Sequence, residues 1–179
     1  MMHYEIKAAE PYDLDACMRV LQSAVAHMRS RGFLQWDDKY PNREVLQNDI
    51  RAGSLHVVRV AGAVAGFAAF DRNEPAEYAA IDFQYPTPAM YVHRLCIDPA
   101  FQRRGLALSL MQFAFGLASQ KGCRSIRLDT RSDNSAALAL YRKLGYRIRG
   151  HVHFPRCPGY EFPCMEIVIS PAPGNTSSL

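Results

Sequence analysis

The sequence predicts an α/β protein in which one mixed central β-sheet of about seven strands carries helices on both faces. The chain has 179 residues, of which 49% are hydrophobic and 21% are charged, as expected of a globular protein with one domain. Short apolar or alternating segments, each bounded by turn residues, indicate the strands. Strands follow one another early in the chain and alternate with helices later, which favours one mixed sheet with a crossover connection.

The chain is expected to begin with a strand and a helix. Residues 4–8 alternate in the manner of a strand, and Asp13 or Asp15 can cap the helix that follows. This helix should end near Gly32. Its apolar residues recur at helical spacing: Leu14, Met18, Leu21, Val25 and Met28.

A loop and a second helix come next. Residues 35–40 are expected to form a loop that holds the only tryptophan of the chain, and Asn42 can cap a helix that ends at Gly53. Two apolar strands joined by a hairpin turn are then expected at residues 54–60, Ala61-Gly62 and 64–70.

The second half of the chain alternates strands with helices. Residues 71–88 contain three prolines and are expected to be irregular. Strands are expected at 91–97, 125–129, 146–151 and 162–169, and helices at 104–120 and 134–144. The polar, proline-rich residues 170–179 are expected to be a flexible tail.

The charge is distributed unevenly. The net charge is +4, but residues 102–149 carry 10 basic and 2 acidic groups, a net charge of +8 for that segment. Nucleic acid is not the expected partner, because the segment lacks a recognition motif and interleaved exposed aromatic residues. No apolar run approaches the length of a membrane span, so no membrane partner is expected. Five cysteines without a C-x-x-C pair and the absence of a signal peptide favour the cytoplasm.

A basic turn before the predicted helix 104–120 is the first candidate site. The first amides of a helix lack acceptors within the helix, and the helix dipole adds positive charge there, so a phosphate can bind. Gly105 permits close approach of an anion to the backbone, and Ala107 is also small. Arg103 and Arg104 add charge. The turn matches neither the dinucleotide fingerprint nor the P-loop.

A second segment follows one strand later. Asn134 can cap a helix, and Tyr141 lies seven residues further on, along the same helix face. Three alanines keep one side of this helix slim, so a ligand could lie against it: Ala136, Ala137 and Ala139.

The two segments together resemble the GNAT (GCN5-related N-acetyltransferase) superfamily. Residues 102–107, QRRGLA, fit its motif [QR]-x-x-G-x-[GA], and the segment from Asn134 to Tyr146 fits N-x-x-A-x-x-x-Y-x-x-x-G-[FY]. The order of the predicted elements agrees over residues 4–169. A subgroup of bacterial small-molecule type is suggested by Gln35-Trp36, Tyr40-Pro41 and Asn48-Asp49-Ile50. The resemblance implies one acetyltransferase domain over residues 1–169, acetyl-CoA as donor and a primary amine of a small molecule or peptide as acceptor.

The resemblance also implies which residues bind the donor. The pyrophosphate would be held by Gln102, Arg103, Arg104, Gly105, Leu106 and Ala107. The pantetheine arm would pair with the strand residues Leu95, Cys96 and Ile97, and Asn134 would contact it from another side. Tyr141 would bond the sulfur and protonate the leaving thiolate, since a phenol stays protonated at pH 7.

The general base and the acceptor site are less clearly marked. His93 stands where many relatives carry a glutamate, and imidazole titrates in the useful range. A histidine bonded within the sheet is the competing interpretation. Four residues are candidates for the acceptor side: Trp36, Tyr40, Glu77 and Asp82. The two aromatic residues can equally serve as cover for the core.

Other functions remain open at this stage. Cys96 could act as an acyl-carrying nucleophile, but no histidine partner is evident. No metal is expected, because the residues His151, His153, Cys157 and Cys164 match no standard zinc spacing. A non-catalytic, acetyl-CoA-binding regulatory module is the alternative to an enzyme. The sequence leaves open the acceptor and the oligomeric state, a homodimer included.

Overall fold

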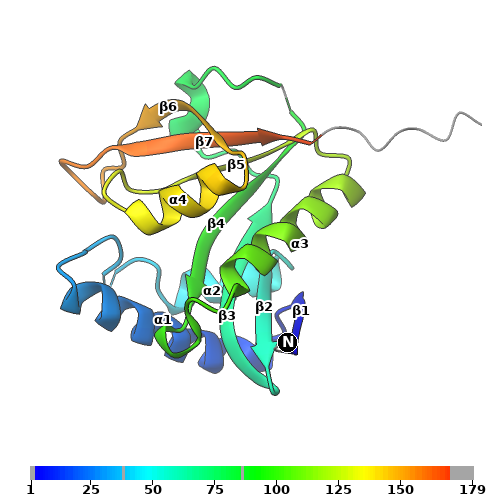
Figure 1. Ribbon diagram of the computed structural model, residues 1–179, viewed down its shortest axis with the longest axis vertical. Coiled ribbons are helices and arrows are strands. Elements are labelled where there is room, and N and C mark those ends of the chain that lie inside the picture. The colour runs from blue at the N-terminus through cyan, green and yellow to red at the C-terminus, as the bar shows by residue number, and fades with distance from the viewer. Residues whose placement is uncertain (1–2, 38, 86, 170–179) are drawn as a thin grey trace, which may run out of the picture. The chain divides into compact units, whose positions relative to one another are not determined.

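The computed structural model describes residues 3–37, 39–85 and 87–169. The expected tail, 170–179, lies outside them. The strands form one seven-stranded sheet in the order β1-β2-β3-β4-β5-β7-β6 (Figure 1), which confirms the predicted sheet. The chain divides into two compact units, and each is described in turn. The first spans Met1–Asp71 and Val92–Phe113, and the second spans Arg72–Tyr91 and Ala114–Leu179.

The first unit is built on an antiparallel meander. β1 (Tyr4–Ala8) pairs with β2 (Leu55–Val60), and β2 pairs with β3 (Ala63–Asp71). Ala61 and Gly62 both have positive φ angles, 48° and 82°, as a two-residue hairpin turn requires. The hairpin predicted from this dipeptide is therefore confirmed.

Two helices of this unit, α1 (Leu14–Ser30) and α2 (Arg43–Arg51), lie close to the predicted ranges. Asn42 caps α2 through its side-chain oxygen, which accepts from the Val45 amide at 3.0 Å. Asp13, the last residue of a short 3-10 helix, η1 (Pro11–Asp13), stands at the N-cap position of α1 as predicted, but its side chain makes no capping hydrogen bond to that helix. Its buried carboxylate instead pairs with Arg59 of β2.

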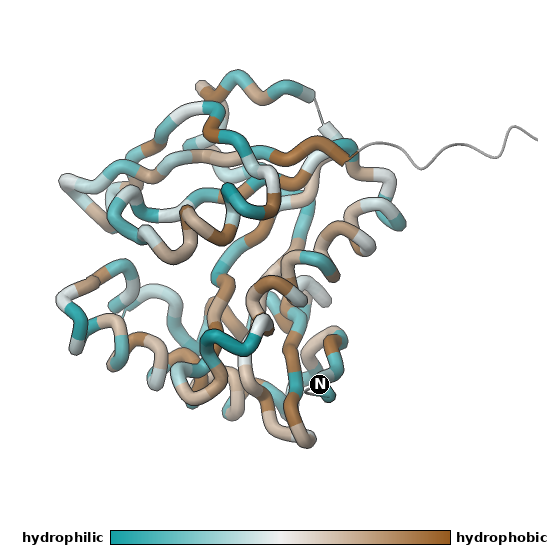
Figure 2. The backbone as a smooth tube through the Cα atoms, in the orientation of Figure 1, coloured by the Kyte–Doolittle hydropathy of each residue, from teal (hydrophilic) through white to brown (hydrophobic). Residues whose placement is uncertain are grey.

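Helices cover both faces of the first unit's strands. Leu55, Val57 and Phe67 pack in one core cluster with α1 and α2. His56 and Phe70 instead contact the ring of Phe113, which belongs to α3 (Leu106–Gln120). Since alternate residues of a strand point to opposite faces, α3 lies on the face opposite α1 and α2. The apolar stretches in Figure 2 follow the strands.

β3 approaches β4 (Ala89–Ile97) very closely at one glycine. A Cβ atom at Gly66 would lie 2.6 Å from the Cys96 carbonyl oxygen and 2.5 Å from the Ile97 side chain. Only a residue without a side chain fits, so the backbone of β4 at Cys96 and Ile97 is held in place by β3.

The second unit contains three antiparallel strands. β5 (Ser125–Asp129) and β6 (Arg147–Val152) both pair with β7 (Phe162–Val168). The unit also holds α4 (Ser135–Lys143) and a 3-10 helix, η2 (Ala76–Ala80), within the stretch predicted to be irregular. Its apolar cluster combines residues of that stretch with the strands: Tyr78, Ala89, Tyr91, Val152, Phe154, Phe162 and Cys164.

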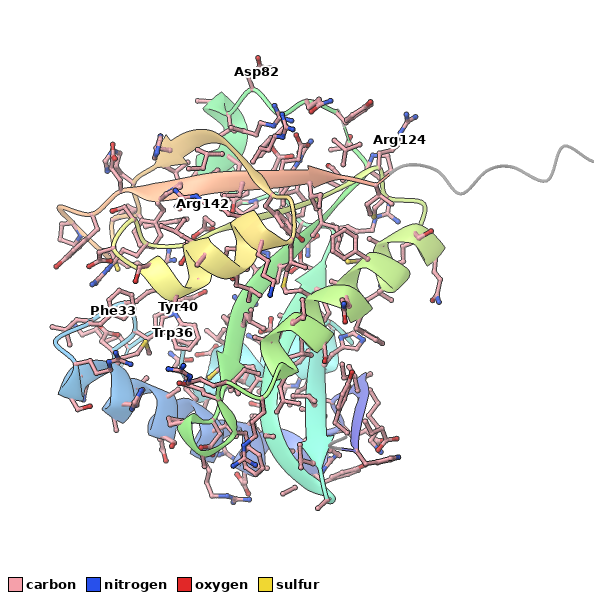
Figure 3. The ribbon with its side chains drawn as sticks, in the orientation of Figure 1. Phe33, Trp36, Tyr40, Asp82, Arg124 and Arg142 are labelled. Atoms are coloured by element: carbon pink, nitrogen blue, oxygen red, sulfur yellow. The ribbon has the colours of Figure 1, made fainter. Side chains whose placement is uncertain are left out.

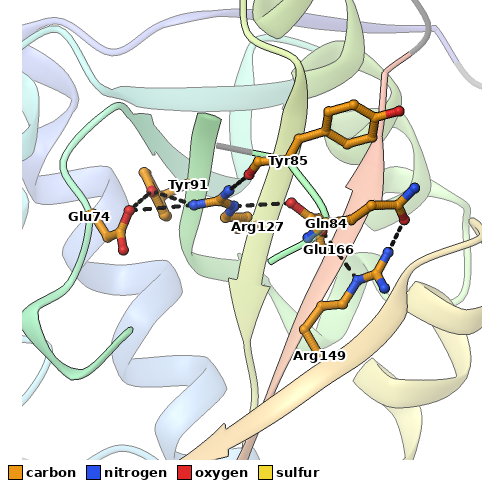
Figure 4. A network of polar contacts seen from close by, with 7 residues as sticks. All are labelled: Glu74, Gln84, Tyr85, Tyr91, Arg127, Arg149 and Glu166. Atoms are coloured by element: carbon orange, nitrogen blue, oxygen red, sulfur yellow. Dashed lines mark hydrogen bonds and ion pairs between the residues drawn. The ribbon is translucent and has the colours of Figure 1, made fainter. Parts of the chain in front are cut away.

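The buried guanidinium of Arg127 connects residues 74–85, which lie in the stretch predicted to be irregular, to β5 (Figure 4). Arg127 of β5 is 2% exposed, and its Nη1 donates to the Tyr91 hydroxyl at 3.1 Å. Nη1 also lies 3.4 Å from Oε2 of Glu74, and Nη2 donates to the Tyr85 carbonyl oxygen. The guanidinium stacks on the Phe83 ring, 3.9 Å from its centroid.

A buried carboxylate completes this network. Glu166 of β7 accepts hydrogen bonds from Arg127 Nε at 3.2 Å and from the Gln84 amide at 2.8 Å, and it forms an ion pair with Arg149, whose Nε lies 3.2 Å away. Buried charges are tolerated when paired in this way. Residues 74–85 are therefore fixed by polar contacts as well as by apolar packing.

We expect Gly66→Ala to destabilise the protein by about 1–3 kcal/mol, because the added methyl forces β3 away from β4. Gly116→Ala is the matched control, since nothing lies within 4 Å of its added methyl and alanine favours a helix. Denaturant unfolding of both variants measures the difference. Equal stabilities would contradict the close approach at Gly66.

Candidate functional site

The basic turn lies between β4 and α3 in the first unit. β4 ends at Ile97, and Asp98 caps the short 3-10 helix η3 (Pro99–Phe101) by accepting from the Ala100 amide at 2.9 Å. The helix predicted from residue 104 begins two residues later, at Leu106. The reason is conformational, because φ is positive at both Arg103 (61°) and Gly105 (84°). Figure 2 colours the turn as hydrophilic.

The turn has the features of an anion site. Arg103 and Arg104 are exposed, and no atom lies within 4 Å of the position that a Cβ would take on Gly105. The Gly105 carbonyl accepts from the Ser109 amide at 2.9 Å, so the helical ladder begins at once and leaves the first amides of α3 without acceptors within the helix. The site thus fits a phosphate group. The Gln102 side chain instead donates to the Ile97 carbonyl at 3.2 Å and braces the end of β4.

The strand residues before the turn differ in exposure. Leu95 and Ile97 are half-buried, whereas Cys96 is 3% exposed. Burial raises the pKa of the Cys96 thiol, so its thiolate is scarce at neutral pH. This argues against Cys96 as a nucleophile. Burial also raises the pKa of Cys17 and of Cys164 to about 12.

His93 faces a carboxylate. Its Nε2 lies 3.6 Å from Oδ1 of Asp71, the last residue of β3, and each side chain is 19% exposed. Both side chains are therefore partly accessible at the edge of the first unit's core. A carboxylate beside an imidazole can orient the ring.

The residue after His93 forms a contact that the sequence did not predict. Arg94 binds Asp49 of α2 through two hydrogen bonds of 2.8 Å, and its Nη1 donates to the Tyr40 hydroxyl at 3.0 Å. Burial raises the pKa of Asp49, and the charge of Arg94 opposes that rise. We call these three residues, Tyr40, Asp49 and Arg94, the Arg94 clamp. No sequence pattern joins positions 40, 49 and 94.

The segment between α1 and α2 carries the aromatic candidates (Figure 3). Trp36 is half-buried and packs against the core of the first unit, as its competing interpretation expected. Tyr40 differs, because its hydroxyl reaches Arg94 of β4. The structure therefore brings Tyr40 to Arg94, the residue that follows His93 in β4.

The second unit holds the other candidates. Asn134 caps α4 by accepting from the Ala137 amide at 3.1 Å, as predicted. Tyr141 is 5% exposed, and burial, followed by the charge of Asp129, raises the pKa of its phenol. Asp129 itself accepts from the Tyr78 hydroxyl at 2.7 Å. Asp129 is a residue that sequence reasoning missed.

Glu77 and Asp82, the two acidic candidates for the acceptor side, are not brought together with the other candidate residues of the second unit. Both are exposed, and the Asp82 side chain points outward from the unit in Figure 3. Within the described part of the chain, no three histidine, cysteine or acidic side chains are grouped so that they could hold a metal ion. No helix of residues 3–37, 39–85 and 87–169 is long and apolar enough to cross a membrane.

Comparison with known protein families matches residues 21–146 to the acetyltransferase (GNAT) family. The chain belongs to this family. The resemblance seen in the sequence is thereby confirmed. GNAT members use acetyl-CoA, and the chain is an N-acetyltransferase with acetyl-CoA as its donor.

Two bacterial relatives are similar in sequence. N-alpha-acetyltransferase RimI of Mycobacterium tuberculosis is 29% identical over 143 residues, which cover 77% of this chain and 80% of that protein. The ribosomal protein bS18-alanine N-acetyltransferase of Salmonella typhimurium is 36% identical over 70 residues. That match covers 37% of this chain and 47% of the relative.

Solved structures agree on the fold. A GNAT acetyltransferase from Streptococcus agalactiae has a TM-score of 0.80 at 27% identity and covers 95% of this chain and 99% of its own. The ribosomal-protein-S18-alanine N-acetyltransferase from Escherichia coli has a TM-score of 0.70 at 21% identity, with 99% and 100% covered. The predicted single-domain GNAT fold is therefore confirmed.

We expect Gly105→Glu to lower acetyl-CoA affinity by about 100-fold, because a carboxylate at the helix start repels phosphate. Gly122→Glu is the matched control: its φ is also positive, at 68°, and its surroundings are also open. Calorimetric titration with acetyl-CoA measures both. Retained binding in Gly105→Glu would remove the turn from the donor site.

We expect Arg94→Met to lower the stability at pH 7 by about 3 kcal/mol, because Asp49 is left as a buried charge without a partner. Its raised pKa then rises further, so the folded chain binds a proton more tightly than the unfolded chain does. Stability then falls as the pH rises, and the loss is smaller at pH 5. Urea unfolding of the variant and of the unmodified protein at pH 5, 6 and 7 measures the difference in stability at each pH.

Arg43→Met is the control for that prediction, since the Arg43–Asp15 pair is 57% and 70% exposed. It should cost less than about 1 kcal/mol at each pH. A loss in Arg94→Met that is the same at pH 5 and pH 7 would refute the buried charge.

Proposed function

We propose that this enzyme transfers the acetyl group of acetyl-CoA directly to a primary amine bound beside His93. Family membership supports the donor, and the observation that carries the site is the exposed basic turn before α3. Arg103 and Arg104 supply charge there, and the open space at Gly105 leaves room for a phosphate. No acyl-enzyme is needed, since burial keeps the Cys96 thiol protonated.

The donor is proposed to lie along the end of β4. The amides from Arg103 to Ala107 would bind the pyrophosphate. Leu95, Cys96 and Ile97 would pair through their backbone with the pantetheine arm, and Asn134 would contact it from α4. Support for the strand comes from Gly66, at which β3 packs directly against the backbone of Cys96 and Ile97.

Tyr141 is proposed to donate a hydrogen bond to the departing thiolate. A thiol of ordinary pKa, about 8.5, is a stronger acid than an ordinary phenol of about 10. Burial raises the pKa of Tyr141 further, so complete transfer of its proton to the thiolate is uphill. A hydrogen bond that strengthens as negative charge develops still lowers the barrier.

His93 is proposed to remove a proton from the amine, directly or through water. Its proximity to Asp71 supports this role, because a neighbouring carboxylate can orient the imidazole ring toward the amine. Tyr40 and Trp36 are proposed to line the acceptor side. Glu77 and Asp82 remain acceptor candidates that rest on their exposure alone.

The first proposed acceptor is the α-amino group of a peptide. Two relatives support it by name, the RimI enzyme of Mycobacterium tuberculosis and the bS18-alanine enzyme of Salmonella typhimurium. A small amine is the second candidate, since a mycothiol acetyltransferase of Amycolatopsis mediterranei is 33% identical over 87 residues.

A panel assay separates these acceptors. Release of free CoA would be measured with an alanyl hexapeptide, spermidine, an aminoglycoside and free amino acids. Turnover of the peptide alone supports the first candidate, and turnover of a small amine supports the second. Tight acetyl-CoA binding without turnover on any amine would favour a regulatory module and contradict the proposal.

We also propose that residues 1–169 form the catalytic domain and that the enzyme acts in the cytoplasm. The described elements extend from Tyr4 to Val168. None of the five cysteines, all of which lie within the described residues, is in a disulfide, which is typical of a reducing compartment.

We expect Tyr141→Phe to lower turnover by about 100-fold while acetyl-CoA affinity changes less than about two-fold, because the hydrogen bond matters most as charge develops. Tyr146→Phe is the control. That hydroxyl is buried without a hydrogen-bond partner among the described residues, so removing it should change turnover little. Steady-state kinetics across pH decide, and full turnover in Tyr141→Phe at every pH would reject the role.

A further inference from the structure

Arg94 has an unusual backbone conformation for a residue inside a strand. Its φ is +56°, in the left-handed region that a residue with a side chain adopts at a cost of order 1 kcal/mol. In a regular strand His93 and Arg94 would point to opposite faces. Arg94 bonds to Asp49 of α2, whereas His93 faces Asp71 of β3 at 3.6 Å. The left-handed backbone therefore lies at the residue that joins β4 to α2, directly after His93.

The Arg94 clamp joins three segments that are distant in sequence. The guanidinium uses Nε and Nη2 for Asp49 and Nη1 for the Tyr40 hydroxyl, and the side chain is only 12% exposed. Because the guanidinium group is planar and rigid, one side chain fixes the positions of both Asp49 and Tyr40. Since the side chain is largely buried and three of its five N–H groups bond to Asp49 and Tyr40, we expect Arg94 to act on a substrate through the residues it holds.

One of those segments is closed by its own hydrogen bonds. The Asp37 amide donates to the Tyr40 carbonyl at 3.0 Å, and Asp37 Oδ1 accepts from the Lys39 and Tyr40 amides at 2.8 Å each. Trp36 stands directly before this turn and packs on the core. The hydrogen bond between the Tyr40 hydroxyl and Arg94 thus connects this turn to β4.

We propose that Arg94 is a positioning residue for the acceptor amine. The Arg94 clamp fixes Tyr40 against β4, at the residue directly after His93, and thereby shapes the acceptor surface, while acetyl-CoA binding does not depend on it. The inference rests on the proposed function, in which His93 faces the acceptor. It adds that the largely buried guanidinium of Arg94, which does not contact the amine itself, contributes to specificity for the acceptor.

Trp36 is the only tryptophan of the chain, so its fluorescence reports on this segment. Two variants loosen the clamp: Arg94→Asn, since asparagine accepts a left-handed backbone, and Tyr40→Phe, which removes one hydroxyl and leaves the ion pair. Acrylamide quenching of Trp36 should increase about two-fold in Arg94→Asn and less in Tyr40→Phe. Asp15→Asn, in an exposed pair at α1 and α2, should leave it unchanged.

Kinetics give the functional readout. With an alanyl hexapeptide and with spermidine as probes, the amine KM should rise about ten-fold in Arg94→Asn and about three-fold in Tyr40→Phe. The acetyl-CoA dissociation constant, measured by calorimetry, should stay within about two-fold of that of the unmodified enzyme. Tyr40→Phe keeps the buried ion pair and so provides a folded variant even if Arg94→Asn unfolds.

Three results would overturn the inference. One is unchanged quenching of Trp36 in both variants. Another is a loss of acetyl-CoA affinity as large as the rise in amine KM. The last is an unchanged amine KM with only a lower melting temperature. If the unmodified enzyme acetylates neither probe, the proposed acceptors fail, and the quenching result alone then decides whether the clamp stands.

Discussion

The arrangement of the first unit depends on the buried ion pair between Arg94 and Asp49. It joins α2 to β4, and through the Tyr40 hydroxyl it also holds the segment that leads into α2. Burial disfavours the Asp49 carboxylate, and the adjacent guanidinium offsets that cost. An alternative packing of α2 on the strands would leave both charges unpaired inside the core. The pair therefore contributes to a unique arrangement more than to net stability.

Local signals in the sequence were sufficient for most elements, and long-range contacts were not predictable from it. Asn42 and Asn134 cap helices as expected, because an N-cap depends only on amides two or three residues away. Asp13 stands in a similar sequence context, yet its carboxylate is taken by Arg59, 46 residues away. The same applies to the site: the basic turn is encoded in six consecutive residues, whereas the Arg94 clamp joins three distant positions.

Both units fix an irregular segment with a buried arginine. In the second unit Arg127 holds residues 74–85 through Glu74, Tyr91 and the Tyr85 carbonyl, and in the first unit Arg94 holds the turn at Tyr40. Loops with few apolar residues cannot be ordered by packing alone. A planar guanidinium can bond backbone and side chains in several directions, which makes it suited to this purpose.

The cysteines have a practical consequence for measuring catalysis. Four of the five side chains are buried, and burial raises the pKa values of Cys17, Cys96, Cys123 and Cys164. A thiol-reactive dye attacks thiolates, so these four groups of the folded enzyme react slowly. Each catalytic cycle, in contrast, releases one solvent-accessible CoA thiol. Product can therefore be followed continuously with such a dye, against a background set mainly by half-buried Cys157.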